Sequence, residues 1–464
     1  MQYHRARTWQ IGFFTLNNTA INIYYMMMLY IAYFASGVLG LGVALVSGLI
    51  ATMAVAEGAV DPFIGWLIDR RRSRFGKFRP FMVMGNGIMA LSLLLMYLSQ
   101  GAVALFVIAY GVFIIGYSFQ FCVTRGAQSV LTNDPKQRPL ISAFDMVFNV
   151  MLYVGVTFAV SNLLVPRYGG FTLPMFRQFF LFTAGASAVC TVLAIVGIWG
   201  KDREAYYIST KVEVKLRHCI DILRENRNIR MLMVASSTDK LFSNITQNAV
   251  VTVMIYGIIA GNFALSGQMN MFVFAPSMVI SLLCVAYARK KGQKEALLFS
   301  TWGGILFTAL ILLLFVLGNP MTLSFTEWGI FTVLFMGFLA LRGGFMSINN
   351  SIIMPMVADC IDHETARSRR YAPGMIGALF SAADKLVTSL NTLVIGGLLI
   401  FIGYRDSFPT VDTPYSRGIF WVAMICFCGL PILGWIINLL CLKRYSLDRD
   451  RMADVQRGLH NNNQ

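Results

Sequence analysis

Residues 41–68 read LGVALVSGLIATMAVAEGAVDPFIGWLI, and residues 69–80 read DRRRSRFGKFRP. The first stretch is apolar except for a few polar residues, among them Glu57 and Asp61, and the second is strongly basic. About 20 apolar residues in a helix cross the ~30 Å hydrocarbon core of a bilayer. The two stretches therefore predict a membrane-spanning helix that is followed by a short loop at the membrane surface.

The whole chain has the composition of such helices. Of its 464 residues, 57% are apolar and only 13% are Asp, Glu, Lys or Arg, whereas a soluble domain carries about 25% charged residues. This excludes disorder, a coiled coil and a disulfide scaffold, and it argues against a soluble enzyme. The eight cysteines are scattered without a metal-site spacing, so we expect core cysteines, no metal and no cofactor.

The chain contains twelve apolar stretches that are long enough to span the membrane, including residues 41–68. Backbone groups cannot stay unpaired in lipid, so each stretch is predicted to be a helix of an all-α membrane protein. The predicted spans are 11–34, 41–68, 80–99, 103–124, 140–165, 178–200, 231–258, 268–288, 296–318, 328–353, 374–403 and 417–442.

Lys and Arg are distributed very unevenly between the two sets of loops. The termini and the loops after the even-numbered helices contain 31 of the 38, and the opposite loops contain only Arg167, Arg177, Arg405 and Arg417. The positive-inside rule places both termini in the cytoplasm. The net charge of +16 is thus interpreted as a topology signal and as contacts with lipid headgroups, not as a nucleic-acid site.

The longest polar interruption, residues 201–230, divides the chain into two sets of six helices. We expect an N-terminal half at 1–200, a central cytoplasmic loop at 201–230, a C-terminal half at 231–445 and a cytoplasmic tail at 446–464. Two such halves are typical of a transporter that is built from repeats, with its site between them near the membrane midplane.

Ionisable side chains inside predicted spans are candidate functional groups, because an unpaired charge in hydrocarbon is costly. Glu57 and Asp61 are four residues apart, on one face of a helix. Two carboxylates this close would repel unless a cation lies between them or one holds a proton. The pair therefore predicts a cation-coupling site, with proton or Na⁺ as the ion. The alternative is that each carboxylate pairs with a basic side chain on a neighbouring helix.

Two Asp-Lys neighbours also lie inside predicted spans, Asp239–Lys240 and Asp384–Lys385. Adjacent residues on a helix point about 100° apart, so neither pair is a local salt bridge that faces a single cavity. We expect Lys385 to pair across the cavity with Glu57, Asp61 or Asp145. For Asp239 and Lys240 a purely structural role is at least as well supported as a functional one. In that role the lysine side chain would extend towards the membrane surface.

Amide, hydroxyl and carboxylate groups on other spans are candidate contacts for a polar solute, and they could equally join helices. These candidates are Asn18, Asn22, Gln120 and Asp145.

The loop after the second span is predicted to be a cytoplasmic gate, with charges that bridge the halves in one conformation and separate in the other. Its charged members are Asp69, Arg70, Arg74 and Lys77. Natural partners follow the tenth span, namely Asp359, Asp362 and Glu364.

Four motifs in order resemble the glycoside–pentoside–hexuronide:cation symporters, the branch of the major facilitator superfamily that includes the melibiose carrier. They are Asp61-Pro62 through GWLIDRRRSRFGKFRP, LTNDPKQR (131–138), MVADCIDHETARSRR (356–370) and GALFSAADKLVTSLNTLVIGGLLIFIGY (377–404). The resemblance covers essentially the whole chain and implies the major facilitator fold, twelve helices in two halves.

The resemblance also implies roles for single residues. Asp61 and Lys385 match the family's second-helix carboxylate and eleventh-helix lysine. Glu57 stands where the family usually has Asp, and Ser118 lies near a hydroxyl that is thought to help bind the cation. Three positions depart from the family: Asn18 replaces a sugar-binding carboxylate, Phe121 replaces an Asp, and Asp145 occupies a place where Arg is expected.

These observations predict a bacterial inner-membrane transporter, a monomer that takes up a glycoside, pentoside or uronide by cation symport. The lost carboxylates favour a proton over Na⁺ and make melibiose an improbable substrate. They also leave Phe121 as a candidate solute contact. An alternative on the same fold is transport of a lysolipid or another amphiphile. A membrane enzyme is not expected, because the four histidines lie in loops or tails.

Overall fold

A computed structural model describes residues 5–70, 75–99, 102–132, 137–203, 225–368, 373–447 and 451–452. Every regular element in these ranges is helical, as predicted for an all-α membrane protein. The described residues form two compact units. The first runs to the helix that ends at Ile198 and also takes in Gly403–Phe408, and the second contains the remaining helices from Arg227 onward.

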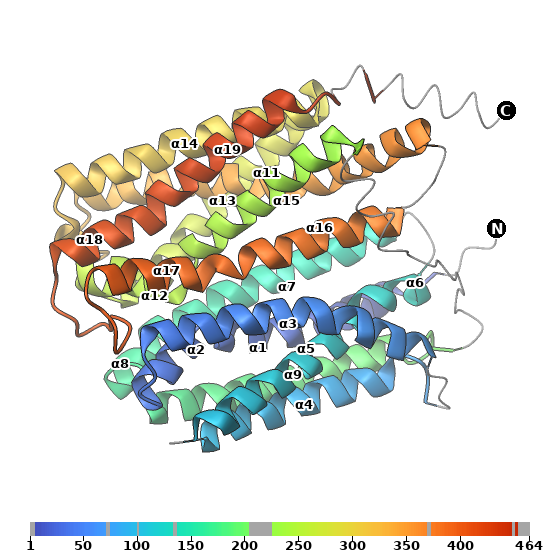
Figure 1. The fold of residues 1–464 in the computed structure, drawn as a ribbon, viewed down its shortest axis with the longest axis horizontal. Coiled ribbons are helices and arrows are strands. Elements are labelled where there is room, and N and C mark those ends of the chain that lie inside the picture. Colours follow the sequence, from blue (N-terminus) through green and yellow to red (C-terminus); the bar gives the residue numbers. More distant parts are fainter. Residues whose placement is uncertain are drawn as a thin grey trace. The chain divides into compact units, whose positions relative to one another are not determined.

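The helices of both units are drawn in Figure 1. Those of the first unit are α1 (Thr8–Met28), α2 (Ile31–Tyr33), η1 (Phe34–Val38), α3 (Val43–Arg70), α4 (Arg79–Leu98), α5 (Val103–Gly126), α6 (Gln128–Leu131), α7 (Arg138–Ala159), η2 (Val160–Leu164), α8 (Val165–Tyr168) and α9 (Leu173–Ile198).

The second unit contains α11 (Arg227–Thr246), α12 (Ala249–Thr252), η4 (Val253–Ile259), α13 (Ala264–Lys291), α14 (Gln293–Leu317), η5 (Pro320–Thr322), α15 (Ile330–Ser368), α16 (Pro373–Thr388), α17 (Leu390–Phe401), α18 (Arg417–Met424), η6 (Ile425–Gly429) and α19 (Leu430–Arg444).

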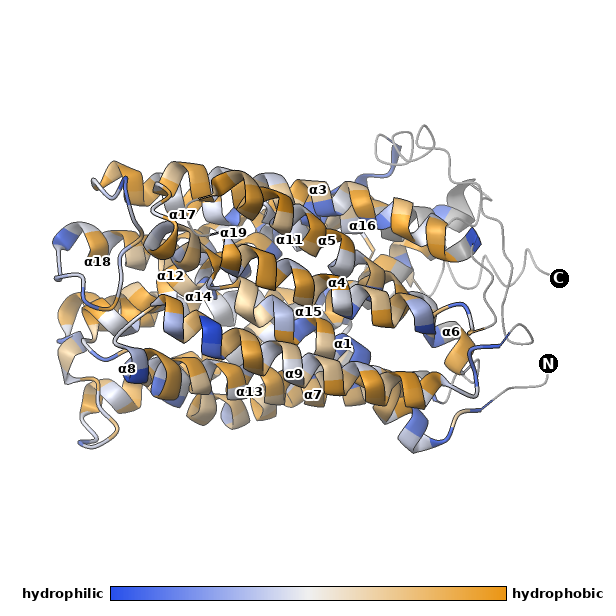
Figure 2. Cartoon of the chain, turned by 90° about the horizontal axis from the view of Figure 1, so that it is seen from below, coloured by the Kyte–Doolittle hydropathy of each residue, from blue (hydrophilic) through white to orange (hydrophobic). Residues whose placement is uncertain are grey.

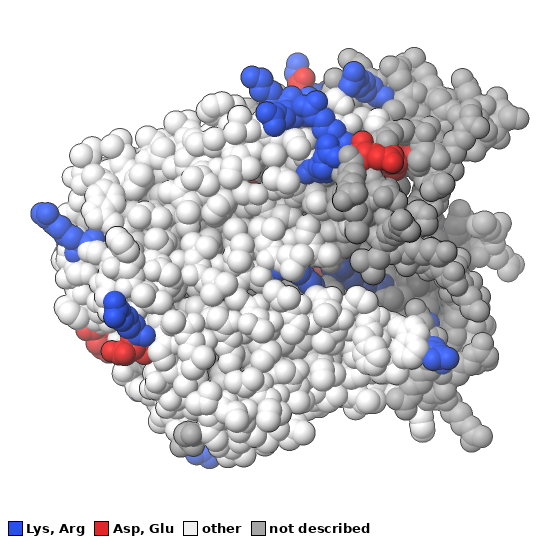
Figure 3. Space-filling view, in the orientation of Figure 1, with Lys and Arg blue, Asp and Glu red and all other residues white. Residues whose placement is uncertain are grey.

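Within the described residues, eleven helices are long and apolar enough to cross a membrane. A twelfth span results if α11 and the segment Ala249–Ile259, which meet at a 47° bend, are one broken span. Counted in this way, the spans follow the twelve predicted from the sequence. Apolar residues dominate the helices in Figure 2, and in the face seen in Figure 3 most Lys and Arg atoms gather near the helix ends.

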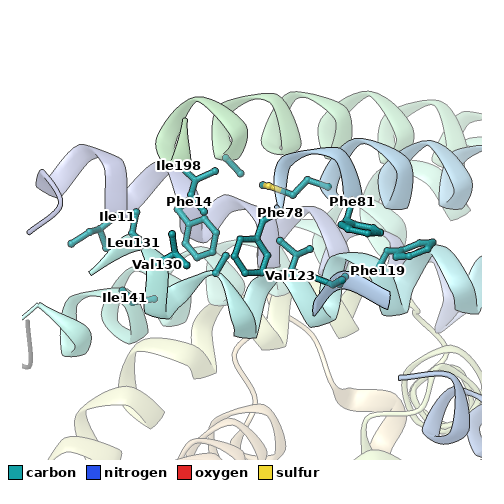
Figure 4. Close-up of a cluster of buried hydrophobic side chains, with 14 of the residues drawn as sticks. Ile11, Phe14, Phe78, Phe81, Phe119, Val123, Val130, Leu131, Ile141 and Ile198 are labelled. Atoms are coloured by element: carbon teal, nitrogen blue, oxygen red, sulfur yellow. The ribbon is translucent and has the colours of Figure 1, made fainter. Parts of the chain in front are cut away.

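The core of the first unit packs where the ends of α1, α4, α5 and α9 meet. Phe78, which precedes α4, is 4% exposed and is seen between Phe14 and Val123 in Figure 4. Helices α1 and α9 approach closely at Gly197, where an added Cβ would lie 2.7 Å from the backbone nitrogen of Phe14. Small residues allow two helices to approach this closely. The resulting van der Waals packing stabilises helix association in lipid, where the hydrophobic effect does not drive it.

A loop of the C-terminal half belongs to the first unit. The amide of Val43 donates a 2.8 Å hydrogen bond to the carbonyl of Arg405. Phe408 is 1% exposed and packs edge-on against Tyr33, with ring centroids 6.4 Å apart. The segment Gly403–Phe408 thus covers the junction between η1 and α3.

Replacement of Gly197 by Leu tests the close crossing of α1 and α9. The added side chain must displace the backbone of α1, so we expect the folded protein to lose about 1–3 kcal/mol, as for other overpacked cores. The melting temperature of the purified protein in detergent should fall. Gly185→Leu, also in α9 but with open space around it, is the matched control and should melt close to the parent. Equal melting of both variants would contradict the close crossing.

Candidate functional site

The carboxylate pair of α3 is held by α5. Ser118, which is fully buried in α5, donates a 2.6 Å hydrogen bond from its Oγ to Oδ1 of Asp61. The thiol of Cys122, one turn further along α5, contacts the backbone carbonyl of Asp61 at 3.5 Å. Both carboxylates of α3 are partly exposed. The structure therefore brings the predicted Glu57, Asp61 and Ser118 together on two neighbouring helices.

Three tyrosines lie within electrostatic range of Glu57, the second carboxylate of the pair. Glu57 interacts electrostatically with Tyr25, Tyr110 and Tyr117, and Tyr117 also interacts with Asp61. A phenol can donate a hydrogen bond to a carboxylate. Tyr25 and Tyr117 are conspicuous in the sequence as possible solute contacts, whereas Tyr110 is missed there because tyrosines are common in this chain.

Pro62 lies inside α3, directly after Asp61. Proline has no backbone N–H, so the carbonyl four residues earlier, that of Gly58, lacks its usual helical hydrogen bond. This carbonyl follows Glu57 in the chain. Pro62 thus removes the regular helical donor of a carbonyl in the turn that separates Glu57 from Asp61.

A second polar group joins α1 to α7. Asn18 donates from Nδ2 to Oδ1 of Asp145 at 2.7 Å, and Asn22 donates to Oδ1 of Asn149 at 2.6 Å. Asn149 also hydrogen-bonds the Asp145 side chain. The four side chains form a ladder with one rung per helical turn. Three of them were predicted, and the four-residue spacing of Asp145 and Asn149 was the signal for the fourth.

The neighbouring candidates in α5 point elsewhere. Gln120 is fully buried, and its Nε2 donates to the carbonyl of Met82 at 3.1 Å and to Thr191 at 3.2 Å. This is the helix-joining role that the sequence left open, and its contact with a solute stays a prediction. Phe121 stacks on Tyr117 with ring centroids 5.9 Å apart, and the guanidinium of Arg125 lies 4.3 Å from its ring.

In the second unit, Lys240 of α11 forms an ion pair with Asp384 of α16, with Nζ and Oδ2 2.8 Å apart. The sequence analysis did not propose this partner. Asp239 instead accepts a 2.9 Å hydrogen bond from Nε1 of Trp435 and is buried. Lys385 lies in the second unit and the α3 carboxylates in the first, so their pairing stays a prediction.

Arg342 is a buried cation inside the predicted span 328–353, without a role assigned from the sequence. It is 3% exposed, its Nη2 donates to Thr246 at 3.2 Å, and its guanidinium lies 4.4 Å from the Phe427 ring. Its Nε and Nη1 are buried and find no hydrogen-bond partner among the described residues. The sequence indicates this residue as a candidate only because Arg342 is a single arginine within the apolar stretch 328–353.

The predicted gate loop is anchored by Asp202, a residue that the sequence analysis missed. Its buried carboxylate accepts backbone hydrogen bonds from Lys77, Phe78 and Arg79 at 3.0 to 3.1 Å and pairs with Arg79 Nε at 3.3 Å. A carboxylate at a helix start is favoured by the exposed amides there. The acidic residue therefore fixes the start of α4.

The other predicted gate residues are described only in part. Arg70 is exposed and its guanidinium lies 4.8 Å from the Trp66 ring, and Asp359 is partly exposed in α15. Arg74 and the side chains of Asp69 and Asp362 lie outside the described residues. Glu364 is buried and accepts a 2.5 Å hydrogen bond from Asn226.

Comparison with known proteins assigns the family. Residues 14–449 match the family described as MFS/sugar transport protein. The chain belongs to this family. The expected major facilitator fold is confirmed, and the protein is a membrane transporter of the sugar-transport type, not an enzyme.

Similar proteins agree with this assignment. The putative glycoside/cation symporter YagG of Escherichia coli (strain K12) is 21% identical over 96% of this chain and 93% of its own length. The isoprimeverose transporter of Lactiplantibacillus pentosus is 20% identical over 96% and 90%. A crystal structure of the nucleoside transporter NupG matches with a TM-score of 0.65 at 10% identity, over 95% of this chain and 99% of that one, which shows the shared fold.

Replacement of Asp202 by Ala tests the anchor of the gate loop. Three backbone amides and Arg79 lose their acceptor, and each buried unpaired donor costs about 1–3 kcal/mol. We expect a clearly lower melting temperature of the purified protein. Asp406→Ala, at an exposed position of the same unit, is the control and should melt like the parent. An unchanged melting temperature for Asp202→Ala would show that the loop does not depend on this carboxylate.

Proposed function

We propose that this transporter takes up a glycoside, pentoside or uronide together with a proton. Its two halves would expose the solute site alternately to the two sides of a bacterial plasma membrane, with both termini in the cytoplasm. The observation that carries the proposal is the α3 carboxylate pair, in which Asp61 is held by Ser118 and Glu57 lies one turn away. We further expect a monomer surrounded by lipid.

Coupling would follow from the charge of this pair. Two carboxylates one turn apart repel when both are ionised, and a proton on one of them removes the repulsion. Asp61 already accepts a hydrogen bond from the Ser118 hydroxyl, so we assign the proton to Glu57. Proton binding biases the equilibrium between inward-open and outward-open states only if the two states differ in proton affinity. The predicted partner that would create this difference is Lys385.

The proton is favoured over Na⁺ by the number of charged ligands. A hard cation is bound by several oxygen atoms, whereas a proton needs one acceptor. Phe121 stands where the related symporters have a third carboxylate, and its ring is stacked between Tyr117 and the Arg125 guanidinium. The carbonyl of Gly58, which lacks its regular helical donor, and the Ser118 hydroxyl are the groups that would have to complete a Na⁺ site.

The solute class is supported by the ladder between α1 and α7. Amide and carboxylate groups there donate and accept hydrogen bonds, which suits a solute with several hydroxyl groups. The relatives described as a glycoside/cation symporter and an isoprimeverose transporter support the same class. Asn18, Asn22, Asp145 and the missed Asn149 are therefore the proposed solute contacts of the first unit.

The basic loops would close the cytoplasmic side. Asp202 holds the backbone from Lys77 to Arg79 in place, and Arg70 at the end of α3 is exposed. We propose that these cations meet Asp359 and Asp362 when the cytoplasmic gate is shut.

Uptake into energised membrane vesicles tests the proposal directly. The panel contains isoprimeverose, methyl β-D-galactoside, D-xylose and D-glucuronate, each with and without Na⁺ and with a protonophore. We expect accumulation of at least one solute that the protonophore abolishes and Na⁺ does not affect. Glu57→Gln should abolish accumulation but retain exchange without a gradient, because the amide cannot carry the proton. Glu327→Gln, at an exposed loop position, should behave like the parent.

Two other results would replace the proposal. Accumulation that requires Na⁺ would assign a sodium site to Glu57 and Asp61. If no sugar of the panel is taken up under any gradient while labelled lysophospholipid is transported, the amphiphile alternative is correct.

Ser118→Ala distinguishes the two ions. A proton on Glu57 does not use the hydroxyl as a ligand, so for proton symport we expect uptake in the absence of Na⁺ to stay close to that of the parent in rate and in apparent affinity. For Na⁺ the hydroxyl would be a ligand, and its loss should lower the affinity. Ser92→Ala, where the hydroxyl bonds only its own helix, is the control.

A further inference from the structure

Helix α11 has a polar face that is unusual for a membrane span. Ser237, Lys240, Asn244 and the following Gln247 are three or four residues apart, and they fall within about 80° of one another around the helix. Lys240 and Gln247 are exposed and Asn244 is partly exposed. The opposite side carries buried apolar residues such as Leu232 and Ile245.

Helix α16 and its continuation α17 present a matching row. Asp384, Thr388 and Asn391 follow one another at intervals of four and three residues, which places them on one face. Asp384 accepts from Nζ of Lys240 at 2.8 Å and from Oγ of Ser237 at 2.8 Å. Oδ1 of Asn391 is buried, and no described residue hydrogen-bonds it. The two rows therefore meet at the ion pair, and this unpaired acceptor lies about two helical turns from Asp384.

The ion pair lies deep in its helices. Lys240 is 13 residues after the start of α11, or about 20 Å along the axis, and Asp384 is about 16 Å from the start of α16. Even so, the Lys240 side chain is 54% exposed, and among the described residues one of its three N–H donors has an acceptor. A half-exposed ammonium at this depth faces water or a polar ligand, because contact with hydrocarbon is too costly.

Both helices are interrupted beside the pair. The span that contains α11 bends by 47° after Thr246, and α16 gives way to α17 at Ser389, five residues after Asp384. Discontinuous helices near the midplane are where transporters commonly place their substrate sites. Burial, exposure and helix breaks thus point to the same place in the second unit.

From this arrangement we infer a second solute subsite, formed in the C-terminal half by Lys240, Asp384 and Asn244. Its ligand is a pair of neighbouring hydroxyl groups of the transported solute. One hydroxyl donates to Asp384 and another accepts from Lys240, which is the pairing that the two charged groups allow at 2.8 Å separation. The inference rests on the proposed function and extends it, because none of the predicted solute contacts lies on α11 or α16.

A purely structural ion pair is the competing explanation, and it makes a different prediction. If the pair only joins α11 to α16, loss of one partner is harmful because it leaves an unpaired charge, and loss of both restores function. A subsite loses affinity in the single variants and also in the double variant. The double variant therefore separates the two explanations.

The experiment uses the full-length protein in vesicles and in detergent. Lys240→Gln, Asp384→Asn and the double variant are compared with the parent, and Arg417→Gln, at an exposed position of the same unit, is the matched control. The probe is the sugar of the uptake panel that the parent accumulates best. Uptake gives KM, and the shift of the melting temperature with added sugar gives binding without any ion gradient.

We expect KM and the binding constant to rise at least tenfold in both single variants and in the double variant, with the melting temperature without sugar little changed in the double variant. Asn244→Ala should raise KM by a smaller factor. Recovery of the parent KM in the double variant would overturn the subsite while leaving the proposed symport intact. If no sugar is accumulated by the parent or stabilises it, the proposed function fails and the subsite fails with it.

Discussion

Hydrocarbon offers no hydrogen-bond partner, and this constraint governs the structure. Inside the described spans the helix itself pairs most backbone groups, with exceptions such as the one at Pro62, and polar side chains must find one another or face water. The ladder from Asn18 and Asn22 to α7, the Ser118–Asp61 bond and the Lys240–Asp384 ion pair are consequences of that rule. Each therefore marks a place where two helices are held in register.

The same constraint allows polar groups to act as a switch. Asp61 accepts a hydrogen bond from the Ser118 hydroxyl, and Glu57 one turn away lies within electrostatic range of several tyrosines. In the mechanism that we propose, a proton on Glu57 changes the charge of this pair and thereby the balance between two packed states.

Packing between helices relies on close approach instead of hydrophobic burial. Gly197 permits α9 to touch the backbone of α1, and Gly85 and Gly116 permit the same between α4 and α5. Outside the spans, Asp202 ties the start of α4 to the end of α9. Rigid units with defined surfaces are what a mechanism based on moving halves requires. Breaks such as that at Ser389 supply irregular backbone near the polar groups.

The sequence by itself determined the helical class, the positions of the spans and the carboxylate pair of α3, because hydropathy and four-residue spacing are local properties. Its family resemblance pointed to the transporter class that comparison then confirmed. Only the tertiary structure decided which side chains are partners. Gln120 hydrogen-bonds Met82 and Thr191, and Asn149 accepts from Asn22. Asp202 binds the backbone of the predicted gate loop, and Lys240 forms an ion pair with Asp384. Partners are 50 to 150 residues apart in most of these cases, and no local pattern specifies which helix faces meet.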